Sequence, residues 1–222
     1  MTLSTMPDEP FSAERSAMVE EQLRRRGIQD ERLLAAMRHV PRHEFISHEK
    51  WEQAYADHPV TIPEQQTTSQ PYIIAAMIQS AEIKPGDKVL EVGAGSGYQT
   101  ALLAELATQV IAVERYSTLA ASAQGALRRM GYRNVVVVEG DGTLGWEPAA
   151  PYDAIIVSAA APRIPPALLE QLASGGRLVI PIGDAQHQTL QLFHKQPDGP
   201  ISRTMLEGCR FVPLIGRHGF AA

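Results

Sequence analysis

A glycine turn between an apolar strand and a helix constrains this chain more than any other feature of its sequence. It lies within KVLEVGAGSGYQTALLAELA, residues 88–107. The run Lys88–Val92 predicts a short strand, and a helix is predicted to begin near Tyr98. Between them every second residue is a glycine, at Gly93, Gly95 and Gly97. Such glycines let the backbone turn sharply and admit a ligand, and the helix N-terminus beyond them presents free N–H groups.

The residues around the turn indicate which ligand it holds. A dinucleotide fingerprint would need a glycine at position 98, where this chain has Tyr98. Glu91, just before the first glycine, would repel a pyrophosphate and attract a cation. The turn resembles the first motif of S-adenosylmethionine-dependent methyltransferases, whose ligand carries a sulfonium and an ammonium but no phosphate. This resemblance implies S-adenosyl-L-methionine as cofactor, with Glu91, the three glycines and Ala94 among its contacts.

Beyond the turn, strand-like and helix-like runs alternate, which is typical of βαβ units and a parallel sheet covered on both faces. The predicted strands are residues 88–92, 109–113, 134–139, 153–157 and 177–181, and the predicted helices are 98–107, 117–130 and 165–173. Two further strand-like runs, 189–194 and 203–212, predict an antiparallel pair at the sheet edge. The expected fold class is α/β: a doubly wound, mostly parallel seven-stranded sheet of the S-adenosylmethionine-dependent methyltransferase type.

The first part of the chain predicts an N-terminal helical segment. Ser12–Arg26 has an amphipathic pattern that Gly27 would stop, and Asp30 is a candidate cap for a helix over Glu31–Arg38. Residues 41–71 include the polar run EQQTTSQP and predict an irregular segment that covers another part of the molecule.

The domain organisation is expected to be simple, because 222 residues suit one domain with a full core. A helix from Pro71 to Ala81 closes the N-terminal segment. We expect a single domain over 1–222, in which 1–81 covers substrate and cofactor and 82–222 is the cofactor-binding α/β core with C-terminal edge strands.

Acidic residues follow two more of the predicted strands. Glu114 ends the second strand, about 20 residues past the turn, where a carboxylate can accept hydrogen bonds from both ribose hydroxyls. Asp141, followed by Gly142, comes after the third strand and could meet the adenine amino group. Glu114 could instead start a helix, and Asp141 could be a plain turn residue. Three acids at successive strand ends, in register with the glycine turn, favour a shared site.

Composition excludes several other classes. The formal net charge of −5 argues against general nucleic-acid binding, and no apolar run is long enough to cross a membrane. Cys209 is the single cysteine and the seven histidines show no ligand spacing, so no disulfide and no metal site are expected. The N-terminus lacks an apolar signal-peptide core, which favours the cytoplasm. We expect a monomer without nucleic-acid or membrane partners.

The end of the fourth strand separates classes of methyltransferase. Here the chain has Ser158 followed by three alanines. Enzymes that methylate base amino groups resemble one another in an Asp/Asn-Pro-Pro-aromatic motif at this place, and catechol-type enzymes carry acidic metal ligands. Neither pattern fits this sequence.

Longer blocks make the resemblance specific. The chain contains RGIQDERLLAAMRHVPRHEF, QTTSQPYIIA, NVVVVEGDGTLGW, PYDAIIVSAAAPRIPPALLEQLASGGRLVIPIG and RFVPL. Over about residues 18–214 it resembles the protein-L-isoaspartate (D-aspartate) O-methyltransferases. That resemblance implies methyl transfer to the free α-carboxylate of isoaspartyl residues in damaged proteins and peptides, which starts their repair through a succinimide. Its partners would be isoaspartyl-containing proteins and peptides.

The resemblance also implies roles for a short segment before the helix at Pro71. Ser69 corresponds to the family's active-site serine, which we expect to orient the carboxylate rather than to act as a nucleophile. The cofactor contacts it implies include Gln66, Thr67 and Thr68. A carboxylate is already ionised at pH 7, so the reaction needs no general base. This agrees with the base-free end of the fourth strand.

Two departures from the family's pattern concern the substrate. Where the family has IGxGQTIS, this chain has IPEQQTTS, residues 62–69, which predicts a stiffer loop. Arg163 stands where an acid is frequent and would favour acidic residues beside the isoaspartate. Two alternatives stay open from the sequence: a carboxyl methyltransferase for aspartates of a modified peptide, and a non-catalytic adenosyl-ligand binding protein.

Overall fold

The computed structural model describes residues 10–197 and 199–221. Its N-terminal helical stretch consists of α1 (Ser12–Ala17), a π-helical turn (η1, Met18–Leu23) and a 3₁₀ turn (η2, Arg24–Arg26). The stretch ends at Gly27, whose φ of 94° only glycine adopts readily. Asp30 caps α2 (Glu31–His39) by accepting from the N–H groups of Arg32 and Leu33. The predicted helices of this segment and their two end signals are confirmed.

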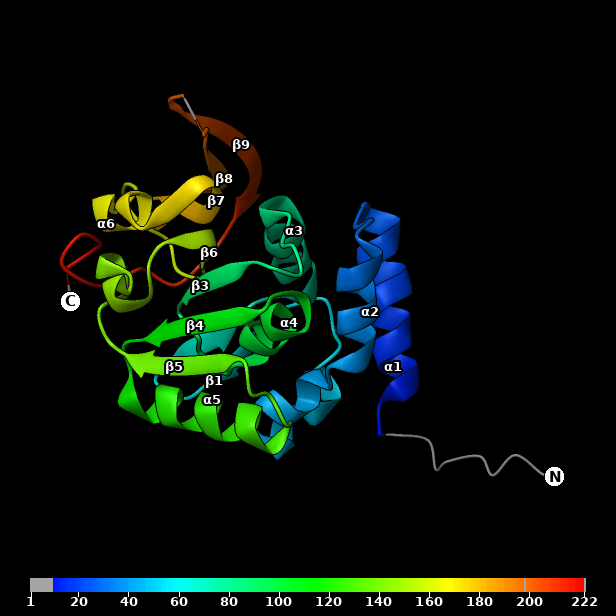
Figure 1. The fold of residues 1–222 in the computed structure, drawn as a ribbon. Helices are drawn as coiled ribbons and strands as arrows, with labels where there is room; N and C mark the ends of the chain where they lie inside the picture. Colours follow the sequence, from blue (N-terminus) through cyan, green and yellow to red (C-terminus); the bar gives the residue numbers. More distant parts are fainter. Residues whose placement is uncertain (1–9, 198, 222) are drawn as a thin grey trace.

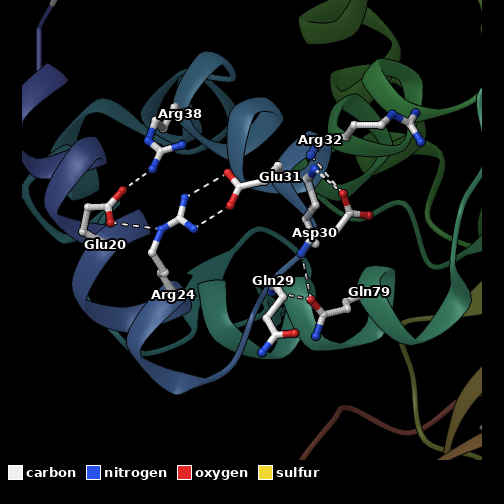
Figure 2. A network of polar contacts seen from close by, with 9 residues as sticks. Glu20, Arg24, Gln29, Asp30, Glu31, Arg32, Arg38 and Gln79 are labelled. Carbon is white, nitrogen blue, oxygen red and sulfur yellow. Dashed lines mark hydrogen bonds and ion pairs between the residues drawn. The ribbon is translucent and has the colours of Figure 1, made fainter.

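Polar contacts hold these helices together and fasten them to the rest of the chain (Figure 2). Arg24 donates to both carboxylate oxygens of Glu31, at 2.6 and 3.0 Å. This pair is exposed and contributes little to stability. Oε1 of Gln79 also accepts from the backbone N–H of Gln29 at 2.6 Å, which joins this segment to the next helix. Gln79 belongs to α3 (Pro71–Ala81), which also has the predicted bounds.

The segment between α2 and α3 is more ordered than the sequence predicts. It contains the 3₁₀ helices η3 (Arg42–Phe45) and η4 (His48–Gln53), then an antiparallel hairpin of β1 (Val60–Ile62) and β2 (Gln66–Thr68). The sequence predicted irregular structure here, and that prediction was wrong for the part of EQQTTSQP that forms β2.

The tip of that hairpin has an unusual backbone. Glu64 and Gln65 both have positive φ, 59° and 56°, although neither is glycine. The N–H of Gln66 donates to the carbonyl of Pro63 at 3.2 Å, which closes a tight turn with the handedness that antiparallel strands prefer. The carboxylate of Glu64 accepts from the hydroxyl of Thr118 at 2.7 Å, and this bond fastens the tip to the helix that begins at residue 117.

The main sheet has seven strands in the order β5-β4-β3-β6-β7-β8-β9 (Figure 1). These strands are β3 (Lys88–Val92), β4 (Gln109–Glu114), β5 (Val135–Glu139), β6 (Tyr152–Val157), β7 (Leu172–Gly183), β8 (Gln188–Lys195) and β9 (Ile201–Cys209). The connections are α4 (Tyr98–Leu106), α5 (Ser117–Arg129), the 3₁₀ turns η5 (Gly142–Leu144) and η6 (Glu147–Ala149), and α6 (Pro166–Glu170). Strands β3 to β7 pair in parallel, and β7, β8 and β9 pair antiparallel. The predicted fold class and the antiparallel edge are confirmed.

The predicted helix over 165–173 is too long. The helix ends at Glu170, and Leu172 already pairs with Tyr152 in the sheet. The register then shifts, and the next pair in the sheet is Ala154 with Arg177. The residues between form a bulge that two glycines permit, since a Cβ on Gly176 would lie 2.8 Å from the carbonyl oxygen of Ala173.

The core fills both faces of the sheet. Alternate residues of β3 point to opposite sides, so Val89 packs with α3 and α4 whereas Leu90 and Val92 pack with the α6 side. The N-terminal helices α1 and α2 add a further layer outside α3 and α4 (Figure 1). Within the described residues no helix is long and apolar enough to cross a membrane.

Candidate active site

The glycine turn lies where the strand order reverses, between β3 and β6. All three of its glycines have positive φ: 90° at Gly93, 54° at Gly95 and 88° at Gly97. The N–H of Gly93 donates to the carbonyl of Val113 at the end of β4, at 2.8 Å. A Cβ on Gly97 would lie 3.1 Å from the Cβ of Ala123 on α5. The turn is thus fixed against β4 and α5, and it opens at the switch point where α/β sheets bind ligands.

A cleft runs across the carboxyl ends of β3, β4 and β6; we call it the main cleft. Its lining includes Gln66, Thr67, Gly93, Gly95, Glu114, Tyr116, Gly142, Ser158 and the segment Val212–Ile215. Six of the predicted cofactor residues therefore lie around one cavity, namely Gln66, Thr67, Gly93, Gly95, Glu114 and Gly142.

Glu114 is held in the main cleft by the turn itself. It is only 5% exposed, and its Oε2 accepts from the N–H of Gly95 at 2.9 Å. Its Oε1 accepts from the N–H of Tyr116 at 3.0 Å. An ionised carboxylate has about four acceptor positions, so each oxygen can still take a hydroxyl from a ligand. The two backbone bonds orient the carboxylate for that purpose.

Glu91 lies at the floor of a smaller cavity, the inner hollow. This hollow is lined by Thr67, Thr68, Ser69, Ile74, Glu91, Gly93, Ala94, Gly95, Ser96, Gln99 and Ser158. Glu91 is fully buried and accepts from the hydroxyl of Thr100 and, at 3.0 Å, from the amide of Gln99. Burial raises the pKa of Glu91 to about 8, although both hydrogen bonds lower it. No basic side chain among the described residues pairs with this carboxyl.

Ser69 lies between two cavities. It lines the inner hollow, and it also lines a larger cavity, the outer hollow. The outer hollow is lined by Pro59, Thr67, Ser69, Gln70, Ile73, Ser158, Gly208, Cys209, Arg210, Phe211 and Val212. Thr67 and Ser158 line all three cavities. A group that enters the outer hollow can therefore meet a ligand held near Glu91 at the position of Ser69.

Two predicted residues lie outside these linings. Gly97 belongs to the turn but contacts α5 instead. Asp141 accepts from the N–H and the hydroxyl of Thr143, at 2.9 and 2.7 Å, and from the N–H of Arg217 at 2.8 Å. Its carboxylate thus fastens the C-terminal segment to the turn after β5, and only its neighbour Gly142 lines the main cleft.

The site also includes residues that had no predicted role in it. In the sequence, Ser158 indicated only that the end of the fourth strand offers no general base. In the structure its hydroxyl accepts from Gln99 at 2.8 Å, and the residue lines all three cavities. The segment Val212–Ile215 closes the main cleft, and Leu214 bonds to the carbonyl of Ala160 at 2.7 Å. The RFVPL block was the available signal, but only the fold shows that this segment reaches the main cleft.

Comparison with known proteins agrees with this geometry. The sequence profile of the protein-L-isoaspartate(D-aspartate) O-methyltransferases matches residues 13–219. The chain is 53% identical to a protein-L-isoaspartate O-methyltransferase of Koribacter versatilis, over 95% of both chains. It is 51% identical to the enzyme of that name from Methanoculleus marisnigri, over 97% of both chains.

Solved structures give the same result. The fold matches a protein-L-isoaspartate O-methyltransferase with a TM-score of 0.83 and 28% identity, over 92% of this chain and 67% of that one. It also matches a candidate enzyme of this type from Plasmodium falciparum, solved with S-adenosyl-L-homocysteine, with a TM-score of 0.78 and 28% identity over 90% and 98% of the two chains. The chain belongs to the protein-L-isoaspartate (D-aspartate) O-methyltransferase family.

Proposed function

We propose that this protein transfers the methyl group of S-adenosyl-L-methionine to the free α-carboxylate of L-isoaspartyl and D-aspartyl residues in damaged proteins and peptides. The observation that carries the proposal is the position of Ser69 between the inner and the outer hollow. One hollow contains the buried acid and the glycine turn, and the other, which is larger, would receive the peptide. Family membership supplies the class of substrate.

The residues of the main cleft and the inner hollow fit the cofactor. Glu114, with both oxygens already oriented, would accept the ribose hydroxyls. Glu91 is a buried carboxyl without a cationic partner among the described residues, and it would pair with the cationic end of the ligand. The glycine turn admits the ligand close to its backbone. S-adenosyl-L-methionine, when bound, supplies a methyl group on a positively charged sulfur.

The acceptor side needs positioning rather than proton transfer. An α-carboxylate is ionised at neutral pH, so its oxygen is already a nucleophile. Ser69 would donate its hydroxyl hydrogen to one carboxylate oxygen and hold the other towards the inner hollow. None of the hydrogen bonds of the described residues joins Ser69 to a histidine, so nothing activates it as a nucleophile. The product is a methyl ester, which loses methanol to form a succinimide far more easily than the acid loses water.

We infer that one chain working in the cytoplasm is enough for this reaction. Ser69, Glu91 and Glu114 all line cavities that share Thr67 and Ser158, so one chain brings these three side chains together. Its single cysteine, Cys209, is free, which suits a reducing compartment.

The substrate assignment is tested with two peptides that differ only in an isoaspartyl or a normal aspartyl residue. The purified protein should transfer labelled methyl to the isoaspartyl peptide and not to its partner. The label should be base-labile, because it is an ester. Equal labelling of both peptides would instead indicate a general aspartate methyltransferase, and labelling of neither would indicate a binding protein.

Ser69→Ala should lower kcat on the isoaspartyl peptide by about 10- to 100-fold, because a hydrogen bond to a charged group contributes about 1.5–3 kcal/mol. Affinity for S-adenosylhomocysteine, measured by calorimetry, should stay unchanged. Ser122→Ala, at an exposed serine of α5 outside the three cavities, is the matched control. A loss of cofactor affinity with unchanged kcat would contradict the role of Ser69.

Glu114→Gln should weaken the binding of S-adenosylhomocysteine by about 1–3 kcal/mol, since one charged acceptor for the ribose is replaced by an amide. Glu139→Gln is the matched control, because Glu139 pairs with Glu114 in register at the end of β5 but is exposed and outside the main cleft. Isothermal calorimetry measures the affinity of both variants for S-adenosylhomocysteine. Equal affinity of the two variants would remove Glu114 from the ribose site.

Glu91 should make cofactor binding depend on pH. Its pKa is raised to about 8, so below that pH the carboxyl is protonated and must lose a proton when a cation binds. Affinity for S-adenosyl-L-methionine should therefore rise with pH up to about 8, and Glu91→Gln should flatten the curve. Calorimetry in two buffers of different ionisation enthalpy measures the released proton.

The ligand-free protein should show the opposite trend in stability. Because the folded pKa lies above the ordinary value of 4.5, the folded state keeps a proton that the unfolded state has lost. This contribution to the free energy of unfolding is complete below pH 4.5 and is lost as pH rises through about 8. An unchanged pH profile of both affinity and stability in Glu91→Gln would disprove the linkage.

A further inference from the structure

Arg42 is a fully buried arginine without an acidic partner. Its side chain is 0% exposed, and no carboxylate among the described residues pairs with it. Its Nε has no hydrogen-bond partner either. Burial lowers the pKa of Arg42 to about 10. A cation in such surroundings depends on the few polar groups that reach it.

Those few groups belong to the segment that carries Ser69. Nη2 of Arg42 donates to the backbone carbonyl of Ser69 at 2.8 Å. Nη1 donates to the hydroxyl of Thr68 at 3.2 Å. If this segment moved away, the guanidinium would lose both of its acceptors inside the protein. Burial of the charge therefore favours one position of the Ser69 backbone.

The other side of Arg42 lies against the start of α4. The guanidinium carbon is 4.9 Å from the centre of the Tyr98 ring, and Tyr98 is the first residue after the glycine turn. Phe45, from the same 3₁₀ turn as Arg42, meets that ring edge-on at 5.9 Å. One short turn, η3, thus holds both the helix that begins at the cofactor side and the segment that carries Ser69.

We propose that Arg42 is a positioning residue, which sets the place of Ser69 relative to the glycine turn by joining the Ser69 carbonyl to the ring of Tyr98. This inference rests on the role proposed for Ser69. An arginine suits it because its planar fork makes two directed bonds while its face stacks on an aromatic ring. Lysine would keep the charge but could not make both hydrogen bonds and also stack on the Tyr98 ring.

A purely structural role would give a different result, and the chain offers a matched control. Arg32 also donates to two backbone carbonyls, those of Ile83 at 3.0 Å and Leu106 at 2.6 Å. It joins the start of α2 to the turn after α3 and to the end of α4, and none of the hydrogen bonds of the described residues joins its side chain to the Ser69 segment. Arg32 is exposed whereas Arg42 is buried, so Arg32→Lys tests the loss of two bonds to backbone carbonyls away from the site.

The experiment compares Arg42→Lys with Arg32→Lys in the full chain. Arg42→Lys should lower kcat on an isoaspartyl peptide by about 10- to 100-fold, because small misplacements of a reacting group cost rates of this order. Affinity for S-adenosylhomocysteine should stay the same. Amide hydrogen exchange should rise over residues 66–70 in Arg42→Lys only. Arg32→Lys should lower the melting temperature and leave kcat near the wild-type value.

A double-mutant cycle with Ser69→Ala completes the test. If Arg42 acts through Ser69, adding Arg42→Lys to Ser69→Ala should lower kcat no further. Multiplying losses would overturn the inference, as would equal kcat in Arg42→Lys and Arg32→Lys. If Ser69→Ala alone leaves kcat unchanged, the role proposed for Ser69 fails and this inference with it. If Ser69→Ala lowers kcat but Arg42→Lys does not, the inference about Arg42 alone fails.

A second variant covers the case in which Arg42→Lys does not fold. Thr68→Val removes one acceptor and leaves Arg42 and the Ser69 carbonyl in place. It should give a smaller fall in kcat, with the same rise in amide exchange over 66–70. Unchanged kcat and unchanged exchange would overturn the proposal.

Discussion

The buried carboxyl of Glu91 is the point on which the site is organised. It lies on β3, inside the sheet, and two side chains of the first turn of α4, Gln99 and Thr100, donate to it. Gln99 also donates to Ser158 at the end of β6. One acid therefore ties a central strand, the helix beyond the glycine turn and the neighbouring strand end to each other. Burying a carboxyl without a cationic partner is unfavourable for the folded protein, which agrees with the cationic ligand proposed for this place.

The predicted parts of this arrangement are those that short-range chemistry determines. The bounds of β3 follow from one apolar run, and the caps at Gly27 and Asp30 follow from residues within one helical turn of their helices. The family blocks, read alongside these patterns, pointed to Ser69 and to the cofactor contacts. The prediction for 165–173 failed because a bulge lets the strand begin directly after the helix, which helical periodicity cannot reveal.

Contacts between distant residues could not be predicted. Asp141 has the expected place at the end of β5, yet Arg217, far along the chain, bonds to its carboxylate. Arg42 and Ser69 meet across 27 positions, and the sequence marked Arg42 only as part of a matching block. The hairpin that covers the turn contains two non-glycine residues, Glu64 and Gln65, in a conformation that glycine prefers. Each of these features depends on the assembled sheet rather than on a local pattern.

The close approach of Gly97 to Ala123 restricts how this protein can change. A Cβ on Gly97 would lie only 3.1 Å from the Cβ of Ala123, so the methyl group at position 123 already lies close to the turn. A larger residue there would push the helix and the turn apart, although Ala123 lines none of the three cavities. A substitution on the buried face of α5 would thereby alter the glycine turn. Ala123 and Gly97 are therefore sterically coupled, because a larger side chain at either position would clash with the residue at the other.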